Sequence, residues 1–172
     1  MAYVKTFSRR RTAAGKRPGF TLIEVLLASA IMGLLFVALM EAFRTGLQML
    51  EHSQRVTIAS SLAEEIHQMT LTLPLSDPDG GAWGAEAGEI GPVYDDVDDL
   101  DGRAFTPPVN ADGMLINGLE EYRQEVIVAS VSEQDFDEVV ADGTSGVSRV
   151  TVIISCRGDE ICRMSWLVVG SM

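Results

Sequence analysis

The longest apolar segment of the chain covers residues 20–40, with the sequence FTLIEVLLASAIMGLLFVALM. As a helix it would be about 30 Å long, close to the hydrocarbon thickness of a bilayer, so we expect it to cross a membrane. Over residues 41–73, apolar positions recur mostly every three or four residues, which predicts an amphipathic helix. Because no proline lies between Pro18 and Pro74, both segments are expected to form one continuous helix. The apolar stripe of its second half consists of Phe43, Leu47, Leu50, Ile58, Leu62, Ile66, Met69 and Leu73.

The second half of the chain has a different pattern. Residues 74–121 are rich in Gly, Asp and Pro, which predicts turns and short strands in a variable loop region. Within residues 122–172, segments rich in β-branched residues predict strands at Tyr122–Val131, Val147–Cys156 and Ile161–Val169, the last two forming a terminal hairpin. The amphipathic helix needs a partner for its apolar stripe, and the sheet provides one. The predicted fold class is therefore α+β, with the long N-terminal helix packed on an antiparallel sheet.

Charge is distributed unevenly along the chain. Residues 1–19 contain six basic residues and no acidic one, whereas the remainder contains 7 basic residues against all 25 acidic ones. A positive cluster before an apolar helix stays in the cytoplasm, so we expect the acidic remainder on the outer side of the membrane. A body this acidic repels phosphate backbones, which argues against nucleic acid as a partner.

The apolar segment is not typical of a cleavable secretory signal peptide. Such a peptide has an apolar core of about 7–15 residues followed by a cleavage site of small residues. Here the apolar run is longer and continues directly into the amphipathic helix. This favours a membrane anchor.

Glu24 is the exception within the apolar segment. An ionised carboxylate near the start of a membrane helix costs roughly 2–3 kcal/mol on insertion scales, so an acid at this position indicates a function. The alternative is that Glu24 lies close enough to the membrane surface to reach the lipid headgroups.

Around Glu24 the chain reads RPGFTLIEVLLASAIMGLL. Here it resembles the type IV pilin family, which includes the pseudopilins of type II secretion and whose signature is a basic leader ending in Gly, then Phe-Thr-Leu-Ile-Glu and a long apolar helix. The resemblance implies that residues 1–19 are a prepilin leader, that a prepilin peptidase cleaves between Gly19 and Phe20, and that Phe20 is then N-methylated.

The resemblance also implies an assembly role for Glu24. Cleavage would create an ammonium group on Phe20, which can pair with the Glu24 carboxylate of a neighbouring subunit. Two charges that are each costly in hydrocarbon would then offset one another. Common filament-forming members carry a proline at the position of Glu41, so its absence here favours the minor pilins and pseudopilins.

The two cysteines flank the predicted hairpin turn in the sequence SCRGDEIC. Pairing Cys156 with Cys162 places Ile154 opposite Met164 on the same side of the ribbon, so the covalent and the apolar registers agree. With the sheet outside the cytoplasm we expect a Cys156–Cys162 disulfide, and two free thiols are the alternative. The Arg-Gly-Asp tripeptide between them is interpreted as a glycine-containing turn.

The run DDVDDLDG is strongly acidic, with carboxylates at Asp95, Asp96, Asp98, Asp99 and Asp101. Their mutual repulsion must be offset by solvent or by a cation. A solvated loop is the favoured interpretation, because the spacing does not follow the helix–loop–helix calcium pattern, and a calcium site at these five residues is the alternative. This loop, the strand YRQEVIVASV and the terminal hairpin are together similar to minor pilins of the mannose-sensitive haemagglutinin type.

The sequence contains no phosphate-binding loop, dinucleotide motif or nucleophile elbow, and two His with two scattered Cys cannot build a structural zinc site. We therefore expect a non-enzymatic protein without a cofactor, calcium being the alternative. The expected function is that of a minor pilin or pseudopilin, a structural subunit of a type IV pilus-like or type II secretion filament. A membrane-anchored, non-polymerising acidic adhesion or binding module is the alternative.

The expected partners are other pilin or pseudopilin subunits, the prepilin peptidase and the inner membrane. The expected location is the bacterial inner membrane, crossed once with the N-terminus on the cytoplasmic side and the head outside. After assembly, the protein would lie in the filament or at the cell surface.

Overall fold

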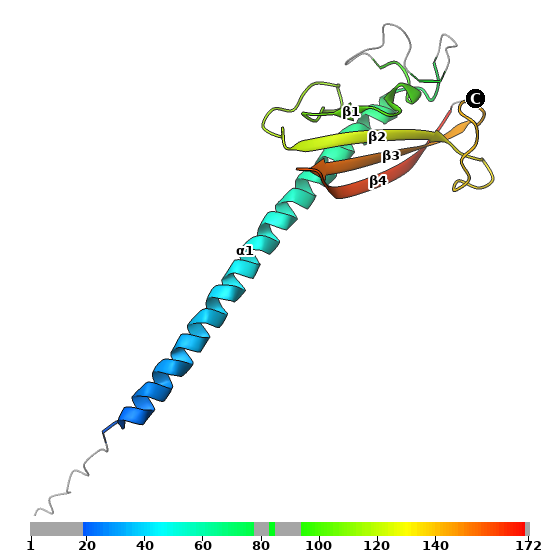
Figure 1. The fold of residues 1–172 in the computed structure, drawn as a ribbon. Helices are drawn as coiled ribbons and strands as arrows, with labels where there is room; N and C mark the ends of the chain where they lie inside the picture. Colours follow the sequence, from blue (N-terminus) through cyan, green and yellow to red (C-terminus); the bar gives the residue numbers. More distant parts are fainter. Residues whose placement is uncertain (1–18, 78–82, 85–93, 171–172) are drawn as a thin grey trace, which may run out of the picture. The chain divides into compact units, whose positions relative to one another are not determined.

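The computed structural model describes residues 19–77, 83–84 and 94–170. Most of the predicted leader and parts of the predicted loop region lie outside these residues. The chain divides into two compact units between Leu47 and Gln48. In chain order the elements are helix α1 (Leu22–Thr72), 3-10 helix η1 (Asp98–Leu100) and strands β1 (Ala104–Phe105), β2 (Tyr122–Ser130), β3 (Val147–Cys156) and β4 (Asp159–Val169) (Figure 1).

Helix α1 is continuous over 51 residues, which confirms the predicted helix to within two residues at each end. Its sequence contains no proline and is rich in Leu, Ala, Met and Glu, which are strong helix formers. The helix ends at Thr72, two residues before Pro74. Proline cannot continue a helix, and it also disfavours helical backbone at the residue before it.

The four strands form one antiparallel sheet in the order β1-β2-β3-β4. The three predicted strands are confirmed, although β4 begins at Asp159 rather than Ile161. The two-residue strand β1 was not predicted. Side chains of β3 alternate between buried and half-buried positions over most of the strand, as expected for a sheet with one face against a core. The structure thus confirms the α+β class, with a long helix packed on an antiparallel sheet.

The core of the second unit lies between one face of the sheet and the C-terminal part of α1. The buried helix residues recur every three or four positions: Ala59, Leu62, Ala63, Ile66, Met69 and Thr70. The sheet contributes apolar residues from its two central strands: Val126, Val128, Val150, Val152 and Ile154. Val97 and Leu100, on either side of the start of η1, are fully buried in the same cluster. Part of the acidic loop is therefore anchored to the core.

Two polar side chains connect the sheet to α1. The fully buried Gln124 amide donates to the carbonyls of Leu62 and Val109, at 3.0 Å each, and its carbonyl accepts from the Val109 N–H at 2.7 Å. On β4, the indole N–H of Trp166 donates to the Thr70 hydroxyl at 3.0 Å. Since a buried polar group is costly unless it is hydrogen-bonded, these contacts fix how the sheet lies on the helix.

The hairpin between β3 and β4 turns at Arg157 and Gly158, which have φ values of 54° and 92°. Positive φ at both central residues is the signature of a two-residue type I′ turn, whose twist matches that of the flanking strands. The interpretation of the Arg-Gly-Asp tripeptide as a glycine-containing turn is confirmed.

The predicted Cys156–Cys162 disulfide is wrong in this structure, in which both cysteines are free thiols. The short turn places Cys156 opposite Asp159, and a register shift then places Cys162 opposite Ile154. Across the other side of β3, the direct partner of Cys156 is Tyr122. Burial, followed by the neighbouring Cys156 thiol, raises the pKa of the Tyr122 hydroxyl above its ordinary value.

The predicted hairpin register is also wrong, by two residues. Val152 lies opposite Met164, whereas the disulfide register would have placed Ile154 there. Because side chains alternate with a period of two, a shift by two leaves the side chains from Cys162 to Val169 on the predicted face, and only the pairs next to the turn, beyond the register shift, depart from it. The apolar pattern therefore predicted the buried face of the hairpin correctly, but it did not determine which residues of β3 and β4 lie opposite one another.

Candidate functional site

The predicted processing bond, Gly19–Phe20, lies immediately before α1. Neither residue belongs to a regular element, and the Phe20 side chain is 84% exposed. The bond is thus accessible and lies outside the helix.

Glu24 is held at the start of the helix by Thr21. The Glu24 N–H donates to the Thr21 hydroxyl at 3.3 Å, and the Thr21 N–H donates to the Glu24 carboxylate at 3.5 Å. This reciprocal arrangement is a capping box, and it places the carboxylate at the positive end of the helix dipole. In the described part of the chain, no basic side chain forms an ion pair with Glu24.

Thr21 was not among the predicted site residues. The sequence does carry its signal, because a threonine three positions before a glutamate, directly ahead of an apolar run, is the pattern of a capping box.

Glu24 also lines a shallow hollow of about 320 Å³ on the helix surface. The residues that line it are Phe20, Glu24, Val25, Ala28, Ser29 and Met32. The small side chains of Ala28 and Ser29 lie between the larger Phe20 and Met32 in the sequence. Small residues at such positions allow another helix to approach closely in a membrane.

All residues in the N-terminal part of α1 are exposed. Its most apolar 18-residue window has a mean hydropathy of 2.5, and none of that window is buried. Among the described residues, α1 is the one helix long and apolar enough to cross a membrane, as predicted for residues 20–40. The exposure continues to Phe43, Leu47 and Leu50, which are 65%, 50% and 57% exposed. The predicted apolar stripe therefore divides, and its packed part begins near Ile58.

The structure separates the five predicted carboxylates of the acidic loop. Oxygens of Asp95, Asp96 and Asp99 lie within 4.8 Å of one another. Asp98 accepts a hydrogen bond from the Gly84 N–H at 3.2 Å, and Asp101 accepts one from the Val128 N–H at 2.8 Å. Asp101 thus supports strand β2, and it is exposed, unlike Asp96, Asp98 and Asp99.

The environment of Asp96 favours its neutral form. Burial, followed by hydrogen bonding with Asp98, raises the pKa of Asp96 from 3.8 to about 8, and the charges of Asp98 and Asp99 add to the shift. The backbone N–H of Asp99, which donates to Asp96 at 3.1 Å, opposes it. A carboxyl group with such neighbours needs a proton or a cation.

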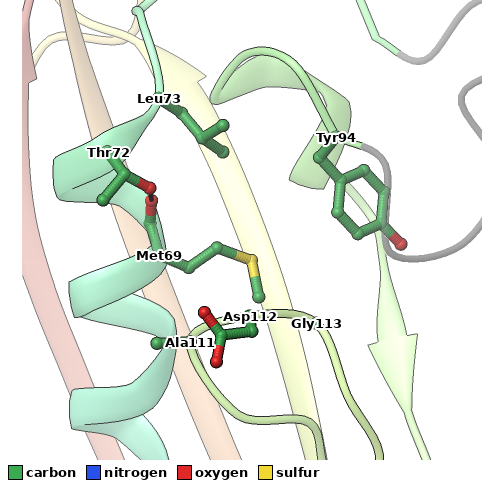
Figure 2. A pocket seen from close by; sticks show the side chains of 7 residues that line it. All are labelled: Met69, Thr72, Leu73, Tyr94, Ala111, Asp112 and Gly113. Atoms are coloured by element: carbon green, nitrogen blue, oxygen red, sulfur yellow. Dashed lines mark hydrogen bonds between the residues drawn. The ribbon is translucent and has the colours of Figure 1, made fainter.

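A second hollow, of about 240 Å³, lies between the end of α1 and the loop over residues 111–113 (Figure 2). Its described lining consists of Met69, Thr72, Leu73, Tyr94, Ala111, Asp112 and Gly113. The Thr72 hydroxyl donates to the Met69 carbonyl at 2.8 Å. This described lining offers one carboxylate and one phenol but no nucleophile with an adjacent base, so it is not arranged for covalent catalysis.

In comparison with known families, residues 15–40 match the prokaryotic N-terminal methylation motif. The matched segment contains Gly19, Phe20, Thr21 and Glu24 together with the apolar part of the helix. Neither the curated proteins nor the solved structures contain a significant match to the chain.

Proposed function

We propose that this chain, which belongs to the type IV pilin and pseudopilin family by its methylation motif and its long helix on an antiparallel sheet, is a minor pilin or pseudopilin of an extracytoplasmic filament. Members of this family are structural, and the chain is accordingly non-enzymatic. The motif and the exposed apolar helix anchor such a protein in the inner membrane before assembly. The filament would be of the type IV pilus or type II secretion kind.

Processing precedes assembly in this proposal. A prepilin peptidase removes residues 1–19, and Phe20 becomes the methylated N-terminus. The accessibility of the Gly19–Phe20 bond supports this step, because neither residue is buried or part of the helix. Cleavage leaves a positive charge four residues before Glu24.

The observation that carries the proposal is the state of Glu24. It is an acid inside the methylation motif, at the start of a helix whose apolar surface is uncovered, and its described partners within the chain are the groups of Thr21. The hollow beside it is lined in part by the small residues Ala28 and Ser29. A neighbouring subunit that brought its Phe20 ammonium to this carboxylate would neutralise both charges in the hydrocarbon.

The assignment to a minor component is supported by the continuity of α1. The helix runs without a break through Glu41, where common filament-forming pilins carry a proline. This chain has no residue there that would remove a helical hydrogen bond or kink the helix.

The test is to compare Glu24→Ala with Glu41→Ala, which removes another exposed acid from the same helix. Each variant is expressed in the native host, and both the processed fraction and the amount in sheared filaments are measured. Losing one partner of a desolvated ion pair costs about 3–5 kcal/mol, so incorporation of Glu24→Ala should fall roughly tenfold or more while processing stays largely intact. Glu41→Ala should be incorporated normally. Normal incorporation of Glu24→Ala would refute the pairing.

A further inference from the structure

Asn117 and Gly118 form an exposed turn between strands β1 and β2. Gly118 has a φ of 86°, a conformation that residues with a side chain rarely adopt. A Cβ atom added to Gly118 would meet no other atom within 4 Å, so the space beside the turn is open. Among the described residues, no hydrogen bond holds the Asn117 side chain. Its carboxamide can therefore rotate toward the backbone nitrogen of Gly118.

The backbone N–H of Gly118 points at a carboxylate, because it donates to Oε1 of Glu120 at 2.9 Å. This hydrogen bond, followed by one from the backbone N–H of Glu120 itself, holds the pKa of the Glu120 carboxyl group below its ordinary value. Glu120 is thus ionised at neutral pH. An ionised carboxylate within hydrogen-bonding distance of an N–H is placed to accept its proton as a general base.

We propose that Asn117 is a site of self-catalysed deamidation, in which Gly118 supplies the attacking nitrogen and Glu120 accepts its proton. The Gly118 nitrogen bonds to Cγ of Asn117 while its proton passes to Glu120. The bond from Cγ to Nδ2 then breaks, and the leaving nitrogen takes the proton from Glu120 and departs as ammonia. Water from the solvent opens the resulting cyclic imide, which leaves aspartate or isoaspartate at position 117. Since the reacting groups belong to neighbouring residues, the ring closes without a diffusional encounter.

The chain contains a second asparagine, Asn110, whose turn is built differently. The Asn110 side-chain oxygen accepts from the backbone N–H groups of Asp112 and Met114, at 3.1 and 2.8 Å. The next residue is Ala111, whose N–H donates to the Glu65 carboxylate at 2.8 Å. A base is therefore present here as well, but the Asn110 carboxamide cannot turn toward the Ala111 nitrogen without losing both of its hydrogen bonds. We expect this asparagine to remain intact.

Deamidation would change the turn that leads into strand β2. It adds one negative charge beside Glu120 and Glu121, and the Glu121 carboxylate already pairs with Arg157 at 2.7 Å. Isoaspartate also adds one carbon atom to the backbone, which alters the geometry of the turn. Because ammonia is lost to the solvent, the change is one-way, and the modified fraction would increase with the age of the protein.

The experiment uses the full-length chain in detergent micelles, incubated at neutral pH and sampled over days. Tandem mass spectrometry of its peptides locates each amide that has become an acid. We expect Asn117 to convert to aspartate and isoaspartate while Asn110 stays unchanged. An Asn117 carboxamide that stays intact, or an Asn110 that reacts as fast, would overturn the proposal. Filament assembly does not enter this measurement, so its result is independent of the proposed function.

Variants test the part played by the base. Glu120→Gln keeps an oxygen that can accept the hydrogen bond but cannot hold the proton. Since a base with a low pKa accepts protons weakly, we expect its deamidation rate to fall about tenfold, less than the roughly hundredfold typical of general bases. The exposed Glu138→Gln should leave the rate unchanged.

The pH dependence separates a base from a structural support. The wild-type rate should rise less between pH 6 and pH 8 than the rate of Glu120→Gln, because the variant depends on hydroxide for proton removal whereas Glu120 is ionised throughout this range. A Glu120→Gln protein that deamidates as fast as the wild type, with the same pH dependence, would overturn the role of Glu120.

Discussion

The two parts of helix α1 consist of similar residues in opposite environments. In the first unit, Leu35 and Leu39 are each 63% exposed, whereas in the second unit Leu62 and Ile66 are 2% and 0% exposed. Helix propensity does not explain the difference, since leucine and isoleucine occur in both parts. The sheet covers the second part, and nothing in the described chain covers the first. Apolar surface left uncovered within one chain requires a partner outside it, which under the proposed function is lipid before assembly and neighbouring subunits afterwards.

The largest effect is expected when one apolar side chain is truncated in each part of the helix, which tests whether the two parts differ in packing. Ile66→Ala should lower the free energy of unfolding by about 2–5 kcal/mol, because it leaves a cavity in a closed core. Leu35→Ala should change it by roughly 0.5 kcal/mol or less in detergent, because micelle contacts simply readjust around an exposed side chain. Denaturant unfolding followed by circular dichroism measures both. Equal losses in the two variants would mean that the first part also packs within the chain.

A change of pH tests the acidic loop of the second unit, where Asp96 is buried. In the folded protein the pKa of Asp96 is raised from 3.8 to about 8 by burial and by Asp98. The protonated Asp96 carboxyl group therefore contributes to the stability of the fold, and this contribution is fully present below about pH 4 and is lost as the pH rises through about 8. The reason is that the unfolded chain gives up this proton at a lower pH than the folded chain does.

Unfolding of the EDTA-treated protein should accordingly become easier between pH 5 and pH 9, in the range where the Asp96 proton is lost. Asp96→Asn, which cannot ionise, should flatten this dependence, and Asp142→Asn should not. A wild-type protein as stable at pH 9 as at pH 5 would show that Asp96 does not remain protonated in the fold.

The smallest expected effect concerns the cysteines. Since Cys156 and Cys162 are free thiols, a reductant should leave the melting temperature unchanged. Alkylation of the denatured, unreduced protein should label both residues, which mass spectrometry detects directly. Packing alone would then hold the β3–β4 hairpin. Labelling that appears only after reduction would restore the disulfide and the register predicted with it.

Much of this fold follows from the sequence because its strongest signals are long and periodic. The absence of proline between Pro18 and Pro74 predicts the single helix, and the β-branched segments predict three of the four strands. Strand β1 has only two residues, so it carries no periodicity that a pattern can detect. The role of Gln124 depends on carbonyls of Leu62 and Val109 that are far away in the sequence.

The candidate site was predicted in part for similar reasons. Gly19, Phe20 and Glu24 lie in one contiguous motif, so their association needs no knowledge of the fold. The cysteine pairing depended instead on the length of the hairpin turn. The type I′ turn places Arg157 at a positive φ, and an arginine gives no sequence signal for that conformation. The acidic loop showed five carboxylates, but only folding reveals that Asp101 supports β2 while three others converge.

The most direct test of the account is the N-terminus of the mature protein. The chain is purified from native cells that contain an active prepilin peptidase, and its N-terminal peptide is identified by mass spectrometry. The account predicts a chain that begins with a methylated Phe20. A polypeptide that still begins at Met1 in those cells would contradict it.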